Sequence, residues 1–192
     1  MKKLIILAIF LLLALENFAQ FDLGIKVGYT TSKLSTNLSD IKEDIKNNFQ
    51  IGAFARLGKR LYLQPEFYYA TSGGTLTGTN NEQEKITFNN LCIPALLGFK
   101  IINGEKINLR IMAGPTANFI VNKKFNGDLL QVNNSDFKNV SWGLDAGAGV
   151  DIWFLALDVR YEWGLNDIYY SASGDATMKS NLFIVSLGFK IL

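Results

Sequence analysis

Hydrophobic and polar residues alternate along most of the chain after residue 20. The clearest stretch is residues 181–192, where apolar residues on one parity, from Phe183 to Ile191, alternate with Ser186, Gly188 and Lys190. Successive side chains of a β-strand point to opposite faces of the sheet. The pattern therefore predicts a strand with one apolar and one polar face.

Eight segments show this alternation, and each is long enough to cross a bilayer as a tilted strand. They are residues 21–30, 49–57, 61–69, 91–101, 107–121, 142–152, 155–165 and 181–192. Every strand edge needs a partner. We therefore predict an all-β fold, an eight-stranded antiparallel up-and-down transmembrane β-barrel in which the last strand pairs with the first.

The two faces of these strands differ in charge. The apolar face carries no charged residue, whereas the polar face carries Asp22, Lys26, Arg56, Glu66, Lys100, Arg110, Asp145, Asp151, Asp158, Arg160, Glu162 and Lys190. A lysine or arginine that faces lipid near the bilayer midplane costs about 2–4 kcal/mol. The one-sided distribution thus favours an apolar face that contacts lipid and a charged face that lines the lumen.

The lumen of an eight-stranded barrel is just wide enough for side chains to fill it. Charges buried there must pair, since an isolated buried charge is costly. We predict a structural ion-pair network of Lys26, Arg56, Glu66, Arg110, Asp158, Arg160 and Glu162, with glycines on the same face leaving room for the long arginines. An ion path or a ligand site is the alternative interpretation of the same residues.

The connections between the expected strands alternate in length. Residues 31–48, 70–90, 122–141 and 166–180 form long connections, and residues 58–60, 103–106 and 153–154 form short ones. Long loops outside the cell and short periplasmic turns are typical of outer-membrane barrels. Aromatic residues concentrate near both ends of the strands, as expected for belts at the two membrane interfaces.

Two local features depart from plain alternation. Pro65, Pro94 and Pro115 interrupt expected strands, and because proline cannot donate to a ladder, we expect bulges or local loss of pairing there. In the first long connection, Leu38, Ile41 and Ile45 have helical spacing, which predicts a short surface helix.

The first 19 residues form a separate unit. Lys2 and Lys3 precede an apolar run from Leu4 to Leu15, and Ala19 is the best cleavage position. This layout predicts a secretory signal peptide at residues 1–19, followed by an outer-membrane β-barrel domain at residues 20–192. A retained membrane anchor is the alternative, although the run is short for a spanning helix.

The composition excludes much chemistry. The chain has no histidine and one cysteine, Cys92, so the common ways of activating a nucleophile and the usual metal-ligand sets are missing. Asp158 and Glu162 could form an acid/base pair, but structural pairing with arginine is the better interpretation. We predict no catalytic, metal or cofactor-binding residues, and the net charge of +2, without a charged block, predicts no nucleic-acid partner.

Several strings resemble the PorT-like outer-membrane β-barrel family. They are residues 61–69 (LYLQPEFYY), 93–100 (IPALLGFK), 113–115 (AGP), 157–165 (LDVRYEWGL) and 186–190 (SLGFK). The resemblance implies an eight-stranded barrel in the cell outer membrane of a Gram-negative cell, with outer-membrane lipid and the barrel insertion machinery as partners. It also implies a link to protein secretion for some members. The terminal Leu192 departs from the aromatic residue with which such barrels often end.

These observations predict an integral, non-enzymatic outer-membrane protein with a structural role or a binding role for its loops. An extracellular or secretion-system protein is the expected kind of partner, although the residues do not identify it. A soluble exported lipid-binding barrel of lipocalin type is the main alternative, because alternation alone does not say which face is outside. A lipid-modifying barrel enzyme is a third hypothesis, weakened by the missing histidine.

Overall fold

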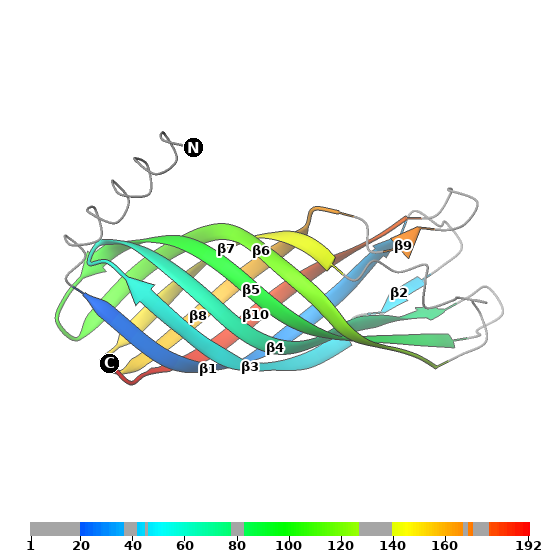
Figure 1. The fold of residues 1–192 in the computed structure, drawn as a ribbon, viewed down its shortest axis with the longest axis horizontal. Helices are drawn as coiled ribbons and strands as arrows, with labels where there is room; N and C mark the ends of the chain where they lie inside the picture. Colours follow the sequence, from blue (N-terminus) through cyan, green and yellow to red (C-terminus); the bar gives the residue numbers. More distant parts are fainter. Residues whose placement is uncertain are drawn as a thin grey trace, which may run out of the picture.

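The protein is a closed antiparallel β-barrel in a computed structural model (Figure 1). The structure describes residues 20–36, 42–44, 46–77, 83–126, 140–166, 169–170 and 177–192, so the predicted signal peptide lies outside the described residues. The strands are β1 (Phe21–Thr36), β2 (Lys42–Asp44), β3 (Lys46–Leu57), β4 (Leu61–Thr77), β5 (Gln83–Asn103), β6 (Ile107–Asn126), β7 (Val140–Ile152), β8 (Leu155–Gly164), β9 (Tyr169–Tyr170) and β10 (Thr177–Lys190). No helix of the described part of the chain is long and apolar enough to cross a membrane.

The barrel is made of the eight long strands, each paired with its neighbour in the chain. The order is β1-β3-β4-β5-β6-β7-β8-β10, and β10 pairs back to β1, from Gly24↔Lys190 to Thr36↔Met178. At the end of this seam the amide of Ile191 donates to the carbonyl of Leu23 at 2.7 Å. The predicted eight-stranded antiparallel barrel is confirmed, including the pairing of the last strand with the first.

The short turns lie at one end of the barrel, together with the C-terminus (Figure 1). In the turn after β5, the amide of Gly104 donates to the carbonyl of Ile107 at 3.2 Å. In the turn after β7, Trp153 has a φ of 58°, in the left-handed region that tight hairpins use. We call this the turn end, and we call the opposite end, where the longer connections and the short strands β2 and β9 lie, the loop end.

Several strands extend farther at the loop end than the alternation predicts. The β4–β5 ladder continues from Tyr69↔Leu91 to Thr77↔Gln83, through residues that were expected to form a loop. Backbone pairing does not require an apolar face, so a ribbon rich in Thr, Gly and Asn continues once the wall no longer faces hydrocarbon. Strand ends were therefore predicted too early, because the bilayer and not the ladder sets the alternation.

The helix expected in the first long connection is not what the structure has at residues 42–44. This segment, β2, pairs with β4, from Lys42↔Thr77 to Asp44↔Thr75. The paired ribbon of β4 offers backbone partners there, and these outweigh a weak helical pattern. Leu38, Ile41 and Ile45, which carried that expectation, lie outside the described residues.

Each of the prolines coincides with a gap in one of its ladders, as predicted. The β3–β4 ladder passes from Phe54↔Glu66 to Leu57↔Leu63 without the pairs beside Pro65. Similar gaps occur beside Pro94 in the β4–β5 ladder and beside Pro115 in the β5–β6 ladder. The register is the same on both sides of these gaps, so each proline costs local hydrogen bonds and leaves the strand pairing intact.

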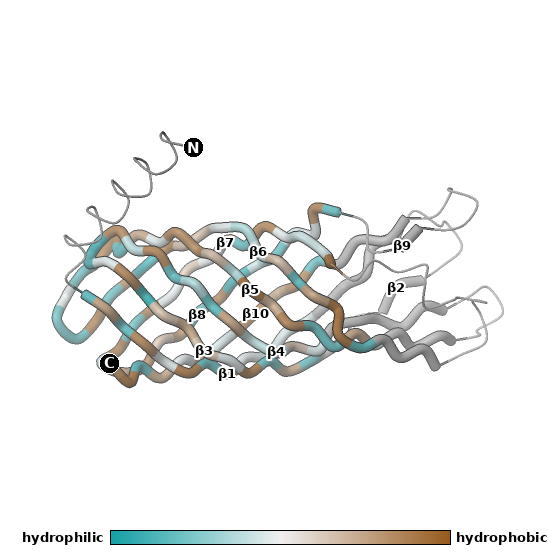
Figure 2. Tube along the Cα trace, in the orientation of Figure 1, coloured by the Kyte–Doolittle hydropathy of each residue, from teal (hydrophilic) through white to brown (hydrophobic). Residues whose placement is uncertain are grey.

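The barrel wall is apolar outside and polar inside. Outward side chains such as Val27, Leu97 and Val159 are exposed, whereas the charged residues of the other parity are buried. Figure 2 shows hydrophobic residues alternating with polar ones along the strands of the wall. This orientation overturns the lipocalin-type alternative, because a soluble lipid carrier needs its apolar face inside.

The outward aromatic side chains lie near the two rims. Tyr29, Phe49, Tyr69, Phe119, Trp142, Trp163 and Phe183 are exposed toward the loop end, and Phe21, Phe99, Trp153, Phe154 and Phe189 toward the turn end. Amphipathic rings at these depths are expected at the two interfaces of a membrane. Their separation marks the part of the wall that contacts hydrocarbon.

Candidate functional site: the barrel lumen

The lumen is lined by charged side chains from most of the barrel strands. β1 provides Asp22 and Lys26, β3 and β4 provide Arg56 and Glu66, β6 provides Arg110, β7 provides Asp145 and Asp151, and β8 provides Asp158, Arg160 and Glu162. They point inward because they share the parity that faces the barrel axis. Each of them is at most 8% exposed.

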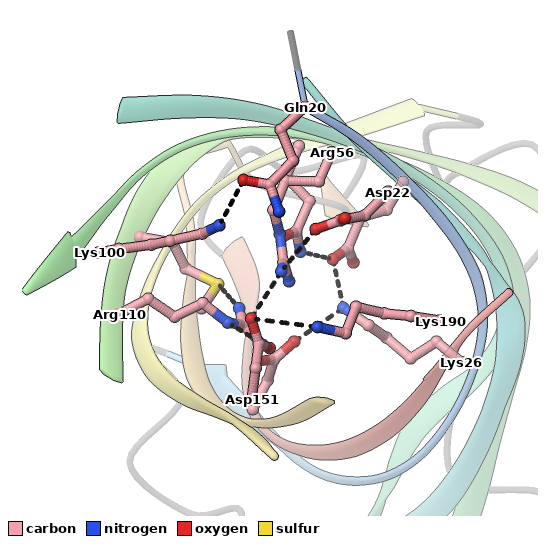
Figure 3. Close-up of polar contacts among 12 residues, drawn as sticks. Gln20, Asp22, Lys26, Arg56, Lys100, Arg110, Asp151 and Lys190 are labelled. Atoms are coloured by element: carbon pink, nitrogen blue, oxygen red, sulfur yellow. Dashed lines mark hydrogen bonds and ion pairs between the residues drawn. The ribbon is translucent and has the colours of Figure 1, made fainter. Parts of the chain in front are cut away.

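The half of the lumen nearest the turn end is drawn in Figure 3. Arg56 lies between Asp22, at 3.5 Å, and Asp151, at 2.8 Å. Asp151 also pairs with Arg110 at 2.9 Å, and Arg110 continues to Asp158. Carboxylates and guanidinium groups from β1, β3, β6, β7 and β8 thus alternate in space.

The alternation continues toward the loop end. Lys26 joins Asp158, at 3.0 Å, to Glu66, and Arg160 joins Glu66, at 3.0 Å, to Asp145, at 3.1 Å. Together the two halves form one chain of ion pairs from Asp22 to Asp145, which we call the ladder. Each internal group of the ladder has a partner of opposite charge on both sides, which offsets the cost of burying it.

The structure brings nearly all of the predicted network residues into the ladder. Lys26, Arg56, Glu66, Arg110, Asp158 and Arg160 belong to it. Glu162 lies in the lumen but has a neutral partner, because Asn118 donates its amide Nδ2 to Glu162 Oε1 at 2.6 Å. That the network is purely structural stays a prediction.

The predicted network left out three carboxylates that complete the ladder, Asp22, Asp145 and Asp151. Asp145 and Asp151 lie on the polar parity of β7; Asp151 contacts Arg56 and Arg110, and Asp145 contacts Arg160. The equal numbers of acidic and basic residues on that parity were the available signal. A balanced, sealed lumen needs every one of these carboxylates as a counter-charge.

Sequence reasoning also missed the apolar side chains inside the lumen. Phe54, Tyr62, Leu96 and Ile184 are almost fully buried on the inward face. The guanidinium carbon of Arg56 lies 5.6 Å from the ring centre of Phe54 and 5.0 Å from that of Tyr62. Such cation–π contacts add to the ion pairs in a desolvated site.

Inward glycines make room for the ladder, as predicted. A Cβ atom on Gly147 would lie 2.7 Å from Cγ of Arg160, and one on Gly149 would lie 2.8 Å from Cζ of Arg110. At Gly24, however, the space is taken by the ring of Phe54, which a Cβ would meet at 2.6 Å. The glycines therefore serve the aromatic filling as well as the arginines.

Three charged residues lie beyond the ladder, Lys100 and Lys190 at the turn end of the lumen and Glu162 at the loop end. At the turn end, Lys100 Nζ donates to Gln20 Oε1 at 3.5 Å, and with Lys190 it lines a pocket of about 300 Å³. At the loop end, Glu162 lines a cavity of about 20 Å³. Lys190 lies 4.0 Å from Asp151, whereas neither Lys100 nor Glu162 has an ion-pair partner within 4.0 Å in the described part of the chain.

The middle of the lumen is a packed core. Arg56, Arg110 and Arg160 are the largest fully buried side chains, and each is at most 1% exposed. In the described residues no group of three or more His, Cys, Asp or Glu side chains could hold a metal ion. The arrangement provides charge compensation across the barrel and keeps solvent out of its centre.

A closed eight-stranded wall with an apolar exterior and a charge-filled interior defines an integral membrane β-barrel. Residues 18–170 match the family model described as outer membrane protein beta-barrel domain. Because this match spans most of the chain, the chain belongs to that family, and its location is the outer membrane.

Solved structures of other outer-membrane barrels are similar in fold. Neisserial surface protein A aligns with a TM-score of 0.57 at 14% identity, covering 88% of this chain and 97% of its own. The outer membrane protein OprG from Pseudomonas aeruginosa aligns with a TM-score of 0.53 at 14% identity, covering 88% of this chain and 95% of its own. No curated protein matches the sequence.

Proposed function

We propose that this protein is a non-enzymatic outer-membrane barrel whose lumen is a structural core and whose loop end binds a partner outside the cell. The observation that supports this most directly is the ladder from Asp22 to Asp145, with its members almost fully buried. Because the barrel is closed and its lumen is filled with side chains, the loop end is the surface that remains for binding a partner.

The ladder argues against a channel. A solute crossing the lumen would have to separate ion pairs such as Arg110–Asp151, at 2.9 Å, and Arg160–Glu66, at 3.0 Å. Breaking one partner away from a buried pair costs about 3–5 kcal/mol. Several such pairs lie in series, so passive flow through the barrel is disfavoured.

The lumen is also poorly suited to catalysis. A general acid or base must reach a substrate, yet the inward carboxylates of β7 and β8 are at most 2% exposed. The chain contains no histidine to take that role elsewhere. These features favour a protein without an active site.

The paired ribbons at the loop end support a binding role. β4 and β5 stay paired as far as Thr77↔Gln83, and β1 and β10 as far as Thr36↔Met178, well beyond the outward ring of Tyr29. Hairpins that project from a rigid wall can present a fixed surface to a partner. The PorT-like strings, such as residues 157–165, favour a partner connected with protein secretion.

Conductance of the purified barrel in planar bilayers tests the sealed lumen. We expect no discrete conductance from the natural chain, and a measurable leak after Arg110→Ala and Arg160→Ala are combined, because two of the largest filling side chains are then lost. Steady conductance of the natural chain would refute the proposal of a structural lumen.

The binding role needs a second measurement on whole cells. Replacing residues 71–89 by a two-residue Asn-Gly turn, which keeps the register pair Ala70↔Asn90, should keep the barrel in the membrane and abolish cross-links between this protein and its extracellular partner. Control cells would carry a Gly-Ser insertion in the turn at residues 104–105, at the opposite end. Cross-links that survive the loop-end change but not the turn-end change would place the binding surface in the periplasm instead.

A further inference from the structure

The cavity at the loop end of the lumen has a mixed lining of polar side chains and the apolar residues Phe88, Ile120, Trp142 and Leu182. Its polar lining comes from Asn90, Asn118, Ser141, Glu162 and Asn166, and its volume is about 20 Å³. This is enough space for one water-sized sphere. The cavity lies next to the last member of the ladder, since Glu162, which lines it, is the register partner of Asp145.

Two of the oxygen atoms around the cavity lack a hydrogen-bond donor. Asn118 uses Nδ2 to donate to Glu162 Oε1, and no group of the described structure donates to Asn118 Oδ1 or Glu162 Oε2. The Glu162 carboxyl also contacts the carboxyl of Asp145, which brings a second negative group to the site. Glu162 is 2% exposed and Asn118 is 6% exposed, so bulk water does not satisfy them. An acceptor buried without a donor costs about 1–3 kcal/mol, and more when it is charged. The site therefore lacks a positive group.

The neighbouring charges do not provide that group. Arg160, the cation of the ladder at this end, already forms ion pairs with Asp145, at 3.1 Å, and Glu66, at 3.0 Å. Glu162 thus adds a second carboxylate beside Asp145 with no cation of its own. The local charge is negative, and the two carboxylates that create it are almost fully buried.

We propose that the cavity binds one calcium-class cation, with Glu162 Oε2 and Asn118 Oδ1 among its ligands. Calcium accepts carboxylate, amide and water oxygens in flexible geometries, whereas magnesium requires a nearly ideal octahedron and usually keeps several waters. A cavity that holds one water-sized sphere suits an ion that sheds its water, which favours calcium. The ion enters from the loop end and supplies the charge that the ladder lacks there.

The neutral oxygens around the cavity suit this role. Ser141 and Asn90 line it from β7 and β5, and Asn166 is held in place because its Oδ1 accepts the amide of Trp142 at 2.6 Å. One close carboxylate among neutral ligands implies modest affinity, of the order of the 10⁻⁴–10⁻³ M typical of extracellular calcium modules. The site goes beyond the proposed binding role of the loop end and does not depend on it.

The tryptophan beside the cavity permits a direct test with terbium, which replaces calcium and luminesces when a nearby indole transfers energy to it. The refolded barrel in a phosphate-free, uncharged detergent is titrated with Tb³⁺ while Trp is excited. We expect a saturable signal that Ca²⁺ displaces and Mg²⁺ does not. Glu162→Gln should weaken binding at least tenfold, and Trp142→Phe should reduce the signal, because Trp142 lines the cavity, while calorimetry still detects Ca²⁺ binding.

The matched control is Lys100→Gln, the unpaired charge at the other end of the lumen, which should leave the titration unchanged. As a second measurement, Ca²⁺ should raise the urea midpoint of the natural barrel but not that of Glu162→Gln. Equal Tb³⁺ affinity in Glu162→Gln and the natural chain, or no saturable signal, would overturn the site, with a proton then neutralising the carboxyl. Displacement by Mg²⁺ as effective as by Ca²⁺ would overturn the choice of calcium.

Discussion

A single outward residue in the middle of β8, Val159, tests the assignment of the two faces most sharply. Its side chain is 48% exposed, and it pairs with Ala148 of β7 on one side and Val185 of β10 on the other. It lies between Asp158 and Arg160, both buried in the ladder. Val159→Arg therefore places a cation in hydrocarbon one residue away from a position where arginine is required.

The expected cost follows from depth in the bilayer. An arginine on the lipid face costs about 2–4 kcal/mol at the midplane and about 0–1 kcal/mol near the interface. At Val159 this lowers the folding equilibrium constant roughly 30- to 1,000-fold. Ile152 is an equally exposed control, also at 48%, but it lies beside the turn at Trp153, so Ile152→Arg should cost about 1 kcal/mol or less.

The assay is folding into lipid vesicles over a urea series. The folded fraction is read from the heat-modifiable band on gels, with tryptophan fluorescence as a second probe. The urea midpoint of Val159→Arg should fall clearly below that of the natural chain, and that of Ile152→Arg should stay near it. Equal shifts at the two positions would refute the placement of β8 across the membrane, and no shift at Val159 would refute its outward face.

Further predictions concern the lumen and the seam. Arg110→Met removes one ion-pair partner each from Asp151 and Asp158 and should lower the free energy of unfolding in urea by about 3–5 kcal/mol. Adding Asp158→Asn should recover part of this loss; an unchanged loss would show that the two pairs are uncoupled. Gly149→Ala should destabilise the natural chain but much less the Arg110→Met chain, because the new Cβ meets the Arg110 guanidinium at 2.8 Å; a double-mutant cycle measures this coupling. Val185→Pro removes a donor from β10, which pairs with both β1 and β8, so the compact heat-modifiable band should be lost; its persistence would show that the barrel does not depend on that strand's ladders.

The wall could be predicted from the sequence because the bilayer acts on every residue of it. In β8, apolar Leu157, Val159 and Tyr161 alternate with Asp158 and Arg160, and the structure places the first set outside and the second inside. Because a charge on the lipid face is costly, each strand that crosses the bilayer must alternate apolar and polar residues with a period of two. That period is lost where β4 and β5 rise beyond the rim, and for this reason the ends of these strands were predicted too early.

The filling of the lumen was only partly predictable, because the inside of a barrel accepts both charged and apolar side chains. Phe54 and Tyr62 lie on the inward parity of β3 and β4 beside Arg56, and nothing in the alternation shows that aromatic rings fill this part of the lumen. The inward parity could be recognised from the sequence. Which inward side chains occupy the centre of the lumen depends on the space beside glycines such as Gly98, which the ring of Tyr62 occupies.

Which residues pair within the ladder could not be predicted from the sequence, for a geometric reason. Lys26 of β1 contacts Glu66 of β4 and Asp158 of β8, although β1 pairs with neither strand. Contacts across the lumen depend on the tilt and stagger of the whole barrel. Local spacing therefore identified the charged face, whereas the pairs across it required the closed structure.

The buried charges also explain how so regular a wall keeps one register. A strand with two apolar faces could shift its pairing register by one residue at little cost, since either set of side chains could then face lipid or an apolar lumen. In β8, the same slip would turn Asp158, Arg160 and Glu162 into the hydrocarbon, and Arg160 alone would cost about 2–4 kcal/mol at the midplane. It would also break the pairs of Arg160 with Glu66 and Asp145. Ion pairs that add little net stability when compared with hydrocarbon packing thus penalise every shifted alignment, which makes the ladder the main determinant of strand register.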